Sequence, residues 1–294
     1  MSSSRAAVFS EVRAQLGEGP VWDSDEQRLV WVDIDGQLVH VTSADGGSTR
    51  SYATPAPVGA AALHRGGDLL LAVGIGFARL SLDDGAIRPL VDAPGVDAAI
   101  ARMNDGEVDP AGRYWAGTKA YDNTPGGGTL FRLDAGGHVE TVLAGVTISN
   151  GLAWSRDGGT LYYVDTPTRS IQRFAFEMAG GTLGARAVHA DTSALSGSPD
   201  GMTIDADGNL WVAFWGGWCV RCFSGADGSL LEEIALPVEQ CSSVQFGGPE
   251  LRTLFVTSAS VGLDAQQLAG QPDAGRVHVV TPGAEGVATR AATV

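Results

Sequence analysis

Four oxygen-bearing side chains each stand directly before a glycine that opens an apolar run. They are Glu18, Asp105, Asn150 and Asp200. Asp and Asn beside Gly are ordinary turn residues, so any one of these positions alone is as consistent with a turn as with a site. Recurrence at one position of a repeated pattern indicates a shared task instead. Carboxylate and carboxamide oxygens are the ligands that a hard divalent cation prefers.

The sequence around these residues is itself repeated. In each copy an apolar run leads to an Asp- or Gly-rich turn and then to a second apolar or aromatic run, as in residues 198–217, SPDGMTIDADGNLWVAFWGG. Two such runs joined by a short turn predict a β-hairpin. The copies begin near residues 20, 60, 106, 151, 201 and 244, and about four strand-like runs fall in each.

A period of roughly 40–50 residues with four strands per unit predicts an all-β fold, a six-bladed β-propeller with four antiparallel strands per blade. We expect a single domain over residues 1–294. Either an N-terminal strand or residues 287–294 would complete the last blade. A parallel α/β fold is disfavoured, because the chain has almost no amphipathic helical stretches to connect parallel strands.

In a propeller, the innermost strand of each blade lines a central channel, so the loops that enter these strands meet at one end. Glu18, Asn150 and Asp200 are therefore predicted to converge there from blades one, four and five. Two carboxylates and a carboxamide around one axis form an oxygen site for a divalent cation and leave positions for water and substrate. Arg102 and Asn104 enter the same end from blade three.

Composition argues against several classes of partner. A formal net charge of −15 disfavours binding to nucleic acid or to an anionic membrane surface. Residues 1–19 contain no apolar run of the signal-peptide kind, and no stretch is long enough to span a membrane. Cys219 and Cys222 form a C-x-x-C without a second pair, so the three cysteines are predicted to be buried thiols. We expect a reducing, cytoplasmic location.

Other catalytic motifs are missing from the sequence. It has no G-x-S-x-G nucleophile elbow and no phosphate-binding loop, and its five histidines stand outside the column of oxygen ligands. The aromatic pattern predicts that five tryptophans pack between blades and that two lie nearer the channel mouth. The first group is Trp22, Trp31, Trp115, Trp154 and Trp211, and the second is Trp215 and Trp218.

Five motifs resemble those of the senescence marker protein (regucalcin), gluconolactonase and luciferin-regenerating enzyme family, which includes bacterial sugar lactonases. They are LGEGPVW at 16–22, RMNDGEVDPAGRYWAGT at 102–118, SNGLAWS at 149–155, PDGMTIDADGNLWVA at 199–213 and FGGPELRTLFVT at 246–257. The resemblance extends over nearly the whole chain, from about residue 12 to residue 282.

This resemblance implies a six-bladed propeller with one catalytic divalent ion, which could be calcium, zinc, manganese, magnesium or ferrous iron. The family's metal ligands fall on Glu18, Asn150 and Asp200. Its substrate contacts fall on Arg102 and Asn104, with a further acidic contact at Asp122. Lys119 and Asp122 stand where relatives often have Met and Glu-rich sequence, a departure that bears on substrate preference and not on the reaction.

The implied activity is that of a metal-dependent lactonase, which opens a small-molecule sugar lactone of the gluconolactone type to the aldonic acid, as a monomer or weak homo-oligomer. The metal would stabilise the oxyanion as water adds, and either Asp200 or a hydroxide on the metal would activate the water. Two alternatives stay open. One is phosphotriester hydrolysis of the diisopropyl-fluorophosphatase kind, against which Arg102 weighs, and the other is a calcium-binding propeller without turnover.

Overall fold

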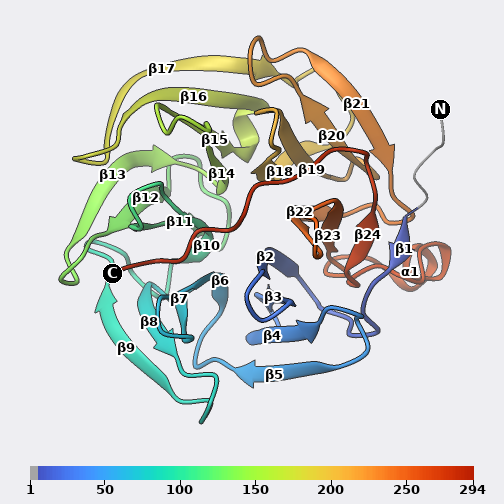
Figure 1. Cartoon of the computed structure of the whole chain (residues 1–294), viewed down its shortest axis with the longest axis horizontal. Helices are drawn as coiled ribbons and strands as arrows, with labels where there is room; N and C mark the ends of the chain where they lie inside the picture. Colours follow the sequence, from blue (N-terminus) through green and yellow to red (C-terminus); the bar gives the residue numbers. More distant parts are fainter. Residues whose placement is uncertain (1–5) are drawn as a thin grey trace.

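Six four-stranded antiparallel sheets surround a central axis in the computed structural model, which describes residues 6–294 (Figure 1). The first five residues of the predicted domain lie outside this part of the chain. The predicted six-bladed β-propeller with four antiparallel strands per blade is confirmed. Within residues 6–294, helical structure is limited to the short helix α1 (Ala265–Gly270) and the 3₁₀ turn η1 (Thr166–Thr168).

The first five blades are each built from four consecutive strands, ordered from the channel outward. Blade one holds β2 (Gly17–Asp23), β3 (Arg28–Asp33), β4 (Leu38–Ser43) and β5 (Thr49–Ala53). Blade two holds β6 (Val58–Leu63), β7 (Leu69–Val73), β8 (Gly76–Leu80) and β9 (Ile87–Asp92). Blade three holds β10 (Ala101–Val108), β11 (Tyr114–Ala120), β12 (Gly128–Leu133) and β13 (Val139–Val146). Blade four holds β14 (Ser149–Trp154), β15 (Thr160–Asp165), β16 (Ser170–Glu177) and β17 (Thr182–Asp191). Blade five holds β18 (Ser198–Ile204), β19 (Leu210–Trp215), β20 (Cys219–Phe223) and β21 (Leu230–Ala235).

Blade six is completed by the N-terminal strand. Its strands are β22 (Cys241–Gly247), β23 (Thr253–Ser258), β24 (His278–Val280) and β1 (Ala7–Val8). β1 pairs antiparallel with β24, with Ala7 opposite Val279 and Val8 opposite His278. The outer strand of the last blade thus comes from the start of the chain, which ties the two ends of the ring together. Of the two closures that the sequence allows, the structure has the N-terminal one.

The C-terminal segment, residues 284–294, runs across one end of the channel instead of joining a blade (red in Figure 1). The Ala206 N–H of blade five donates to Glu285 O at 2.7 Å, and the Ala292 N–H donates to Leu63 O of blade two at 2.7 Å. The segment therefore connects blades on opposite sides of the axis. It lies at the end where the inner strands finish.

The core lies between neighbouring blades. Trp115, Trp154 and Phe176, from blades three and four, pack edge to face with ring centroids 5.6–5.8 Å apart, a favourable arrangement of aromatic quadrupoles. The five tryptophans predicted to pack are all buried, as are the three free cysteines. The predictions of buried packing tryptophans and buried thiols are confirmed.

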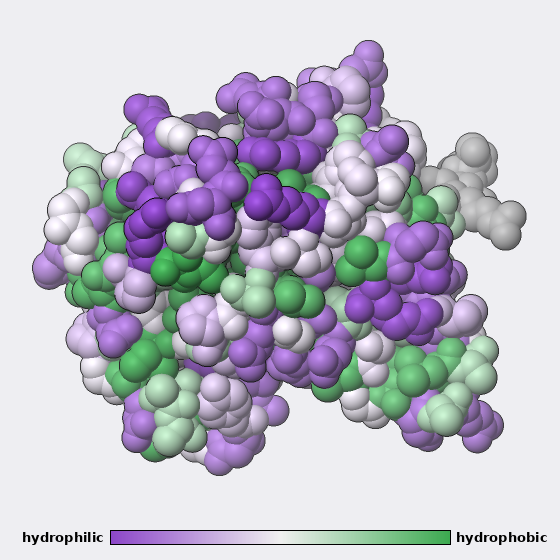
Figure 2. Space-filling view, turned by 90° about the horizontal axis from the view of Figure 1, so that it is seen from below, coloured by the Kyte–Doolittle hydropathy of each residue, from purple (hydrophilic) through white to green (hydrophobic). Residues whose placement is uncertain are grey.

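The rim of the propeller is mixed in character. Figure 2 shows hydrophilic residues interspersed with small apolar patches, without one continuous apolar face on this side. Among the described helices, none has the length and hydropathy needed to cross a membrane.

Candidate active site

Inner strands of the propeller are irregular at the depth of the predicted site. Their pairing registers shift at Glu18/Val21, Met103/Asp105, Asn150/Leu152 and Pro199/Met202. A β-bulge breaks the strict alternation of side chains and re-aims the residue that it contains. The repeated oxygen-ligand-plus-glycine motif is therefore a bulge on an inner strand and not a hairpin turn.

Two glycines of this motif, Gly151 and Gly201, are required by close approach between inner strands. A Cβ on Gly151 would lie 2.6 Å from the Asp200 carbonyl oxygen, and a Cβ on Gly201 would clash with the Ser243 hydroxyl. Such close approach leaves no room for a side chain. These two glycines thus allow the inner strands of blades four, five and six to approach one another closely around the channel.

A cavity of about 220 Å³ opens at the end of the channel where the inner strands begin. It is lined by Leu16, Glu18, Arg102, Asn104, Lys119, Asn123, Ile148, Asn150, Thr166, Asp200 and Trp215. The structure brings together every predicted site residue except Asp122. The members that come together are Glu18, Arg102, Asn104, Asn150 and Asp200.

Entry segments of blades one and four are held by the same device. The Asp33 carboxylate, at the end of β3, accepts hydrogen bonds from the backbone N–H groups of Gln15 and Leu16 at 2.9 and 3.0 Å. The Asp165 carboxylate, at the end of β15, accepts one from the Ile148 N–H at 3.0 Å. Both segments lead directly into a strand that carries a candidate ligand, so these aspartates fix where the ligands start.

A directional chain of hydrogen bonds orients the candidate ligand Asn150. Arg102 Nη1 donates to Asn104 Oδ1 at 2.8 Å, and Asn104 Nδ2 donates to Asn150 Oδ1 at 2.8 Å. Asn150 Nδ2 then donates to Thr166 Oγ1 at 2.7 Å, and that hydroxyl donates to Pro199 O at 2.9 Å. These hydrogen bonds fix the orientation of the Asn150 amide, so that the positions of its oxygen and nitrogen are defined. One lone pair of Asn150 Oδ1 remains available.

Three buried carboxylates crowd the channel. Glu18 and Asp200 are each about 5% exposed, and Asp105 lies at the bulge of β10. Burial, together with repulsion from neighbouring carboxylates, raises the pKa of Glu18 and of Asp200 well above the ordinary value. Burial also raises the pKa of Asp105 to about 7. A bound cation would stabilise this cluster, because its positive charge offsets the repulsion between the ionised carboxylates. Without a cation, protonation of the carboxylates relieves this repulsion.

The residues present fit a divalent ion. Asp200 Oδ1 is buried and has no hydrogen-bond partner among the described residues, whereas Glu18 Oε2 accepts only a 3.1 Å bond from the Gly19 N–H. No group of three or more His, Cys, Asp and Glu side chains that could hold an ion is found in residues 6–294. With Glu18 and Asp200, the amide oxygen of Asn150 would supply a third oxygen donor, a mixed oxygen set of the kind that calcium and similar ions accept.

Asp122 is placed away from the cavity. It is exposed in the turn after β11, where its Oδ1 accepts hydrogen bonds from Thr124 N–H at 2.9 Å and Thr124 Oγ1 at 2.7 Å. The next residue, Asn123, lines the cavity instead. Asn123 has a left-handed backbone with φ of 58°, which Asn tolerates better than most residues and which redirects the chain at this point.

Several lining residues are not among the predicted site residues. Asn123 and Thr166 have no motif that singles them out, although Thr166 directly follows the anchoring Asp165 at the end of β15. Trp215, predicted near the mouth, lines the cavity, whereas Trp218 is 42% exposed in the turn after β19 and does not line it. In the sequence, Lys119 stands out as a departure from relatives.

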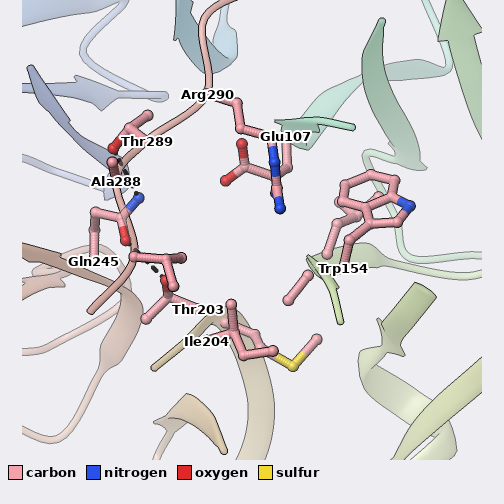
Figure 3. Close-up of a pocket in the computed structure, with 12 residues that line it drawn as sticks. Glu107, Trp154, Thr203, Ile204, Gln245, Ala288, Thr289 and Arg290 are labelled. Atoms are coloured by element: carbon pink, nitrogen blue, oxygen red, sulfur yellow. Dashed lines mark hydrogen bonds between the residues drawn. The ribbon is translucent and has the colours of Figure 1, made fainter. Parts of the chain in front are cut away.

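A second, smaller cavity lies at the opposite end of the channel. Figure 3 shows it between the inner strands and the C-terminal segment, with Arg290 extending toward Glu107 and with Gln245 near Thr289. Its volume is about 30 Å³, which is enough for a few water molecules at most. A sugar-sized ligand therefore does not fit in this second cavity, which lies under the C-terminal segment.

Comparison with known proteins gives matches over nearly the full length. The family model described as "SMP-30/Gluconolactonase/LRE-like region" matches residues 16–260. Regucalcin of Gallus gallus is 37% identical over 286 residues, which cover 96% of this chain and 95% of regucalcin. Pentonolactonase XacC of Haloferax volcanii is 37% identical over 268 residues, covering 90% and 87% of the two chains. The crystal structure of a calcium-binding protein, regucalcin, from Agrobacterium tumefaciens has a TM-score of 0.92 at 26% identity and covers 100% of this chain and 98% of its own.

Proposed function

Because the chain belongs to the SMP-30/gluconolactonase/LRE-like family, we propose that it is a hydrolase that uses one divalent metal ion to open sugar lactones to the corresponding aldonic acids. The observation that carries this proposal is the buried, unpartnered Oδ1 of Asp200 where Glu18 and Asn150 converge. Asp200 lines a cavity of about 220 Å³, which has room for much more than a single water molecule. The lactonases among the relatives support the substrate class.

Glu18, Asn150 and Asp200 would hold the ion. When bound, a divalent ion supplies Lewis-acid polarisation of the lactone carbonyl and stabilises the charge that develops on its oxygen. The Agrobacterium relative is described as calcium-binding, which makes calcium the first ion to test.

Arg102 and Asn104 would position the substrate. Arg102 uses Nη1 for its hydrogen bonds to Met103 O and Asn104 Oδ1, so other guanidinium N–H groups would be available to sugar hydroxyls. Holding the ring in one orientation converts addition of water into an effectively intramolecular step. The apolar walls formed by Leu16, Ile148 and Trp215 lower the local dielectric and strengthen these contacts.

Asp200 would handle the proton in this reaction. Hydrolysis forms a bond between water oxygen and the lactone carbonyl carbon and breaks the bond from that carbon to the ring oxygen. The water loses one proton, and the ring oxygen gains one as it becomes a hydroxyl. The Asp200 carboxylate would accept the first proton and return it to the leaving oxygen.

The test is a panel of five- and six-carbon aldonolactones offered to the metal-stripped protein, with calcium, zinc, manganese, magnesium or ferrous iron added back singly. We expect ring opening only when metal is present. Titration of the released acid in a pH-stat measures it. Saturable metal binding without turnover of any lactone would refute the proposal and leave a binding propeller. Faster turnover of a phosphotriester, offered separately under the same conditions, would assign the site to phosphoryl chemistry instead.

A further inference from the structure

Lys119 is the only lysine in the 294-residue chain, in which 18 of the 19 basic residues are arginine. It lies on β11, lines the candidate active-site cavity and is half-buried. Lysine is a flexible and strongly hydrated cation, so its partial burial has a cost in solvation. A half-buried ammonium in a ligand cavity requires a partner.

The ammonium of Lys119 stands beside another cation. Lys119 and Arg102 are directly opposite each other in the antiparallel pairing of β11 with β10. Directly opposed residues project on the same face, and like charges in such a pair destabilise a sheet. Burial, and then the Arg102 charge, lower the pKa of Lys119, which agrees with this geometry. The pair is unfavourable in the unliganded protein.

No protein group neutralises Lys119. Among the described residues, its ammonium has neither an ion-pair partner within 4.0 Å nor a hydrogen bond to a side chain. Asp200 and the exposed Asp35 are the acidic groups that act on it from further away. In the proposed enzyme, the charge of Asp200 is directed to the metal ion. The cavity wall therefore presents a positive charge at Lys119 that has no ion-pair partner among the described residues.

We propose that Lys119 determines specificity by binding a carboxylate carried by the lactone substrate, so that the site prefers lactones of sugar diacids to neutral aldonolactones. This inference rests on the proposed function. A neutral lactone offers hydroxyls to Arg102 but leaves the ammonium without an opposite charge. A carboxylate on the carbon chain beyond the lactone ring supplies that charge within the same cavity. A phosphate is usually held by several donors, including backbone N–H groups, whereas one ammonium matches one carboxylate.

The test compares two lactones of the same ring size and stereochemistry, one with a terminal carboxylate and one with a terminal hydroxymethyl group. With metal at saturation, the ratio of their kcat/KM values should fall about 10- to 100-fold in Lys119→Met, the range expected for loss of a charge-assisted hydrogen bond. Lys119→Arg should retain most of the ratio. Arg88→Met, which removes an exposed charge from β9, should leave both values unchanged and thereby controls for net charge.

An unchanged ratio in Lys119→Met would overturn the inference while leaving the lactonase proposal intact, because both lactones would still be hydrolysed. A change in metal affinity that accounts for the whole effect would also overturn it, since Lys119 would then act on the ion. If a phosphorylated aldonolactone is preferred over the diacid lactone, the carboxylate assignment is wrong.

A second measurement does not depend on turnover. Because the chain has one lysine, acylation by an N-hydroxysuccinimide ester followed by mass spectrometry reports on Lys119 alone, apart from the N-terminal amine. The open-chain sugar diacid should slow acylation of Lys119 at least several-fold in the metal-loaded protein, whereas the matched neutral polyol should not. Equal rates with the two compounds would refute carboxylate binding, even if the protein hydrolyses no lactone.

Discussion

Replacing Asp200 by Asn separates the two tasks that the structure allows for this residue. The change keeps the shape and one oxygen atom but removes a buried negative charge. Asp200 is about 5% exposed, and burial and Asp105 together raise its pKa. We therefore expect opposite effects on two equilibria: weaker metal binding and greater stability of the metal-free fold.

The expected magnitudes follow from the burial and the unpartnered Oδ1. A hydrogen bond to a charged group contributes about 1.5–3 kcal/mol. The contact between the Asp200 carboxylate and a divalent ion should contribute at least the upper value of this range. The metal Kd should thus rise at least about 100-fold, since about 1.4 kcal/mol corresponds to tenfold. Each unit of raised pKa costs about 1.4 kcal/mol once the carboxyl ionises. The metal-free Asp200→Asn protein should therefore melt at least about 2–4 °C higher than the parent at pH 8.

Calorimetric titration measures the first quantity, and thermal melts of the metal-stripped protein measure the second. Turnover is then compared at metal concentrations that saturate both proteins, so that ligand loss does not mask the chemistry. If turnover returns close to the parent value, Asp200 only holds the metal. If it stays low, Asp200 also accepts the proton, because an amide cannot do so at neutral pH.

Asp105→Asn is the matched control, because Asp105 is a buried member of the same cluster but does not line the cavity. It should raise metal-free stability similarly while weakening metal binding much less. The reasoning is refuted if Asp200→Asn binds metal as tightly as the parent, since Asp200 would then not be a ligand. Equal losses of metal affinity in the two variants would also refute it, because long-range charge alone would explain the effect.

Three further predictions concern the surroundings of the ligands. Asn104→Ala should weaken metal binding about 10-fold, because it releases Asn150 Oδ1. Arg102→Ala should lower kcat/KM for a hydroxylated lactone about 10- to 100-fold and leave the metal Kd nearly unchanged. Calorimetry and kinetics on both variants check this, and the reversed pattern would contradict it. The stability of the metal-free protein should fall as pH rises from about 4 to 7. Burial raises the carboxyl pKa values, to about 7 for Asp105, so the folded chain holds protons that the unfolded chain releases. Thermal melts that show stability rising over this interval would disprove the raised pKa values. Gly151→Ala should destabilise the fold by about 1–3 kcal/mol, since its Cβ would lie 2.6 Å from Asp200 O; denaturant unfolding measures this, with Gly270→Ala, where an added Cβ meets open space, as a control for glycine replacement.

The repeated pattern in the sequence determines the blades and most of the candidate site. Strand formation depends on local alternation of apolar and polar residues and on turn chemistry, both of which are written in contiguous residues. Equivalent positions of a ring of repeats must meet at the axis, so the repeat alone is enough to place Glu18, Asn150 and Asp200 together. The same logic brings Arg102 and Asn104 to the cavity.

Tertiary structure alone decided the features that depend on contacts between distant residues. The pairing of β1 with β24 joins the N-terminal end of the chain to blade six. The C-terminal segment joins the other end to blades two and five. Contacts between residues so far apart in the sequence leave no pattern in neighbouring residues. Asn123 replaces Asp122 at the cavity because one left-handed residue redirects the turn. The opposition of Lys119 to Arg102 depends on the register between two strands. Register is set by packing and by bulges over the whole blade, so a sequence can show that both cations are present but not that they share one face.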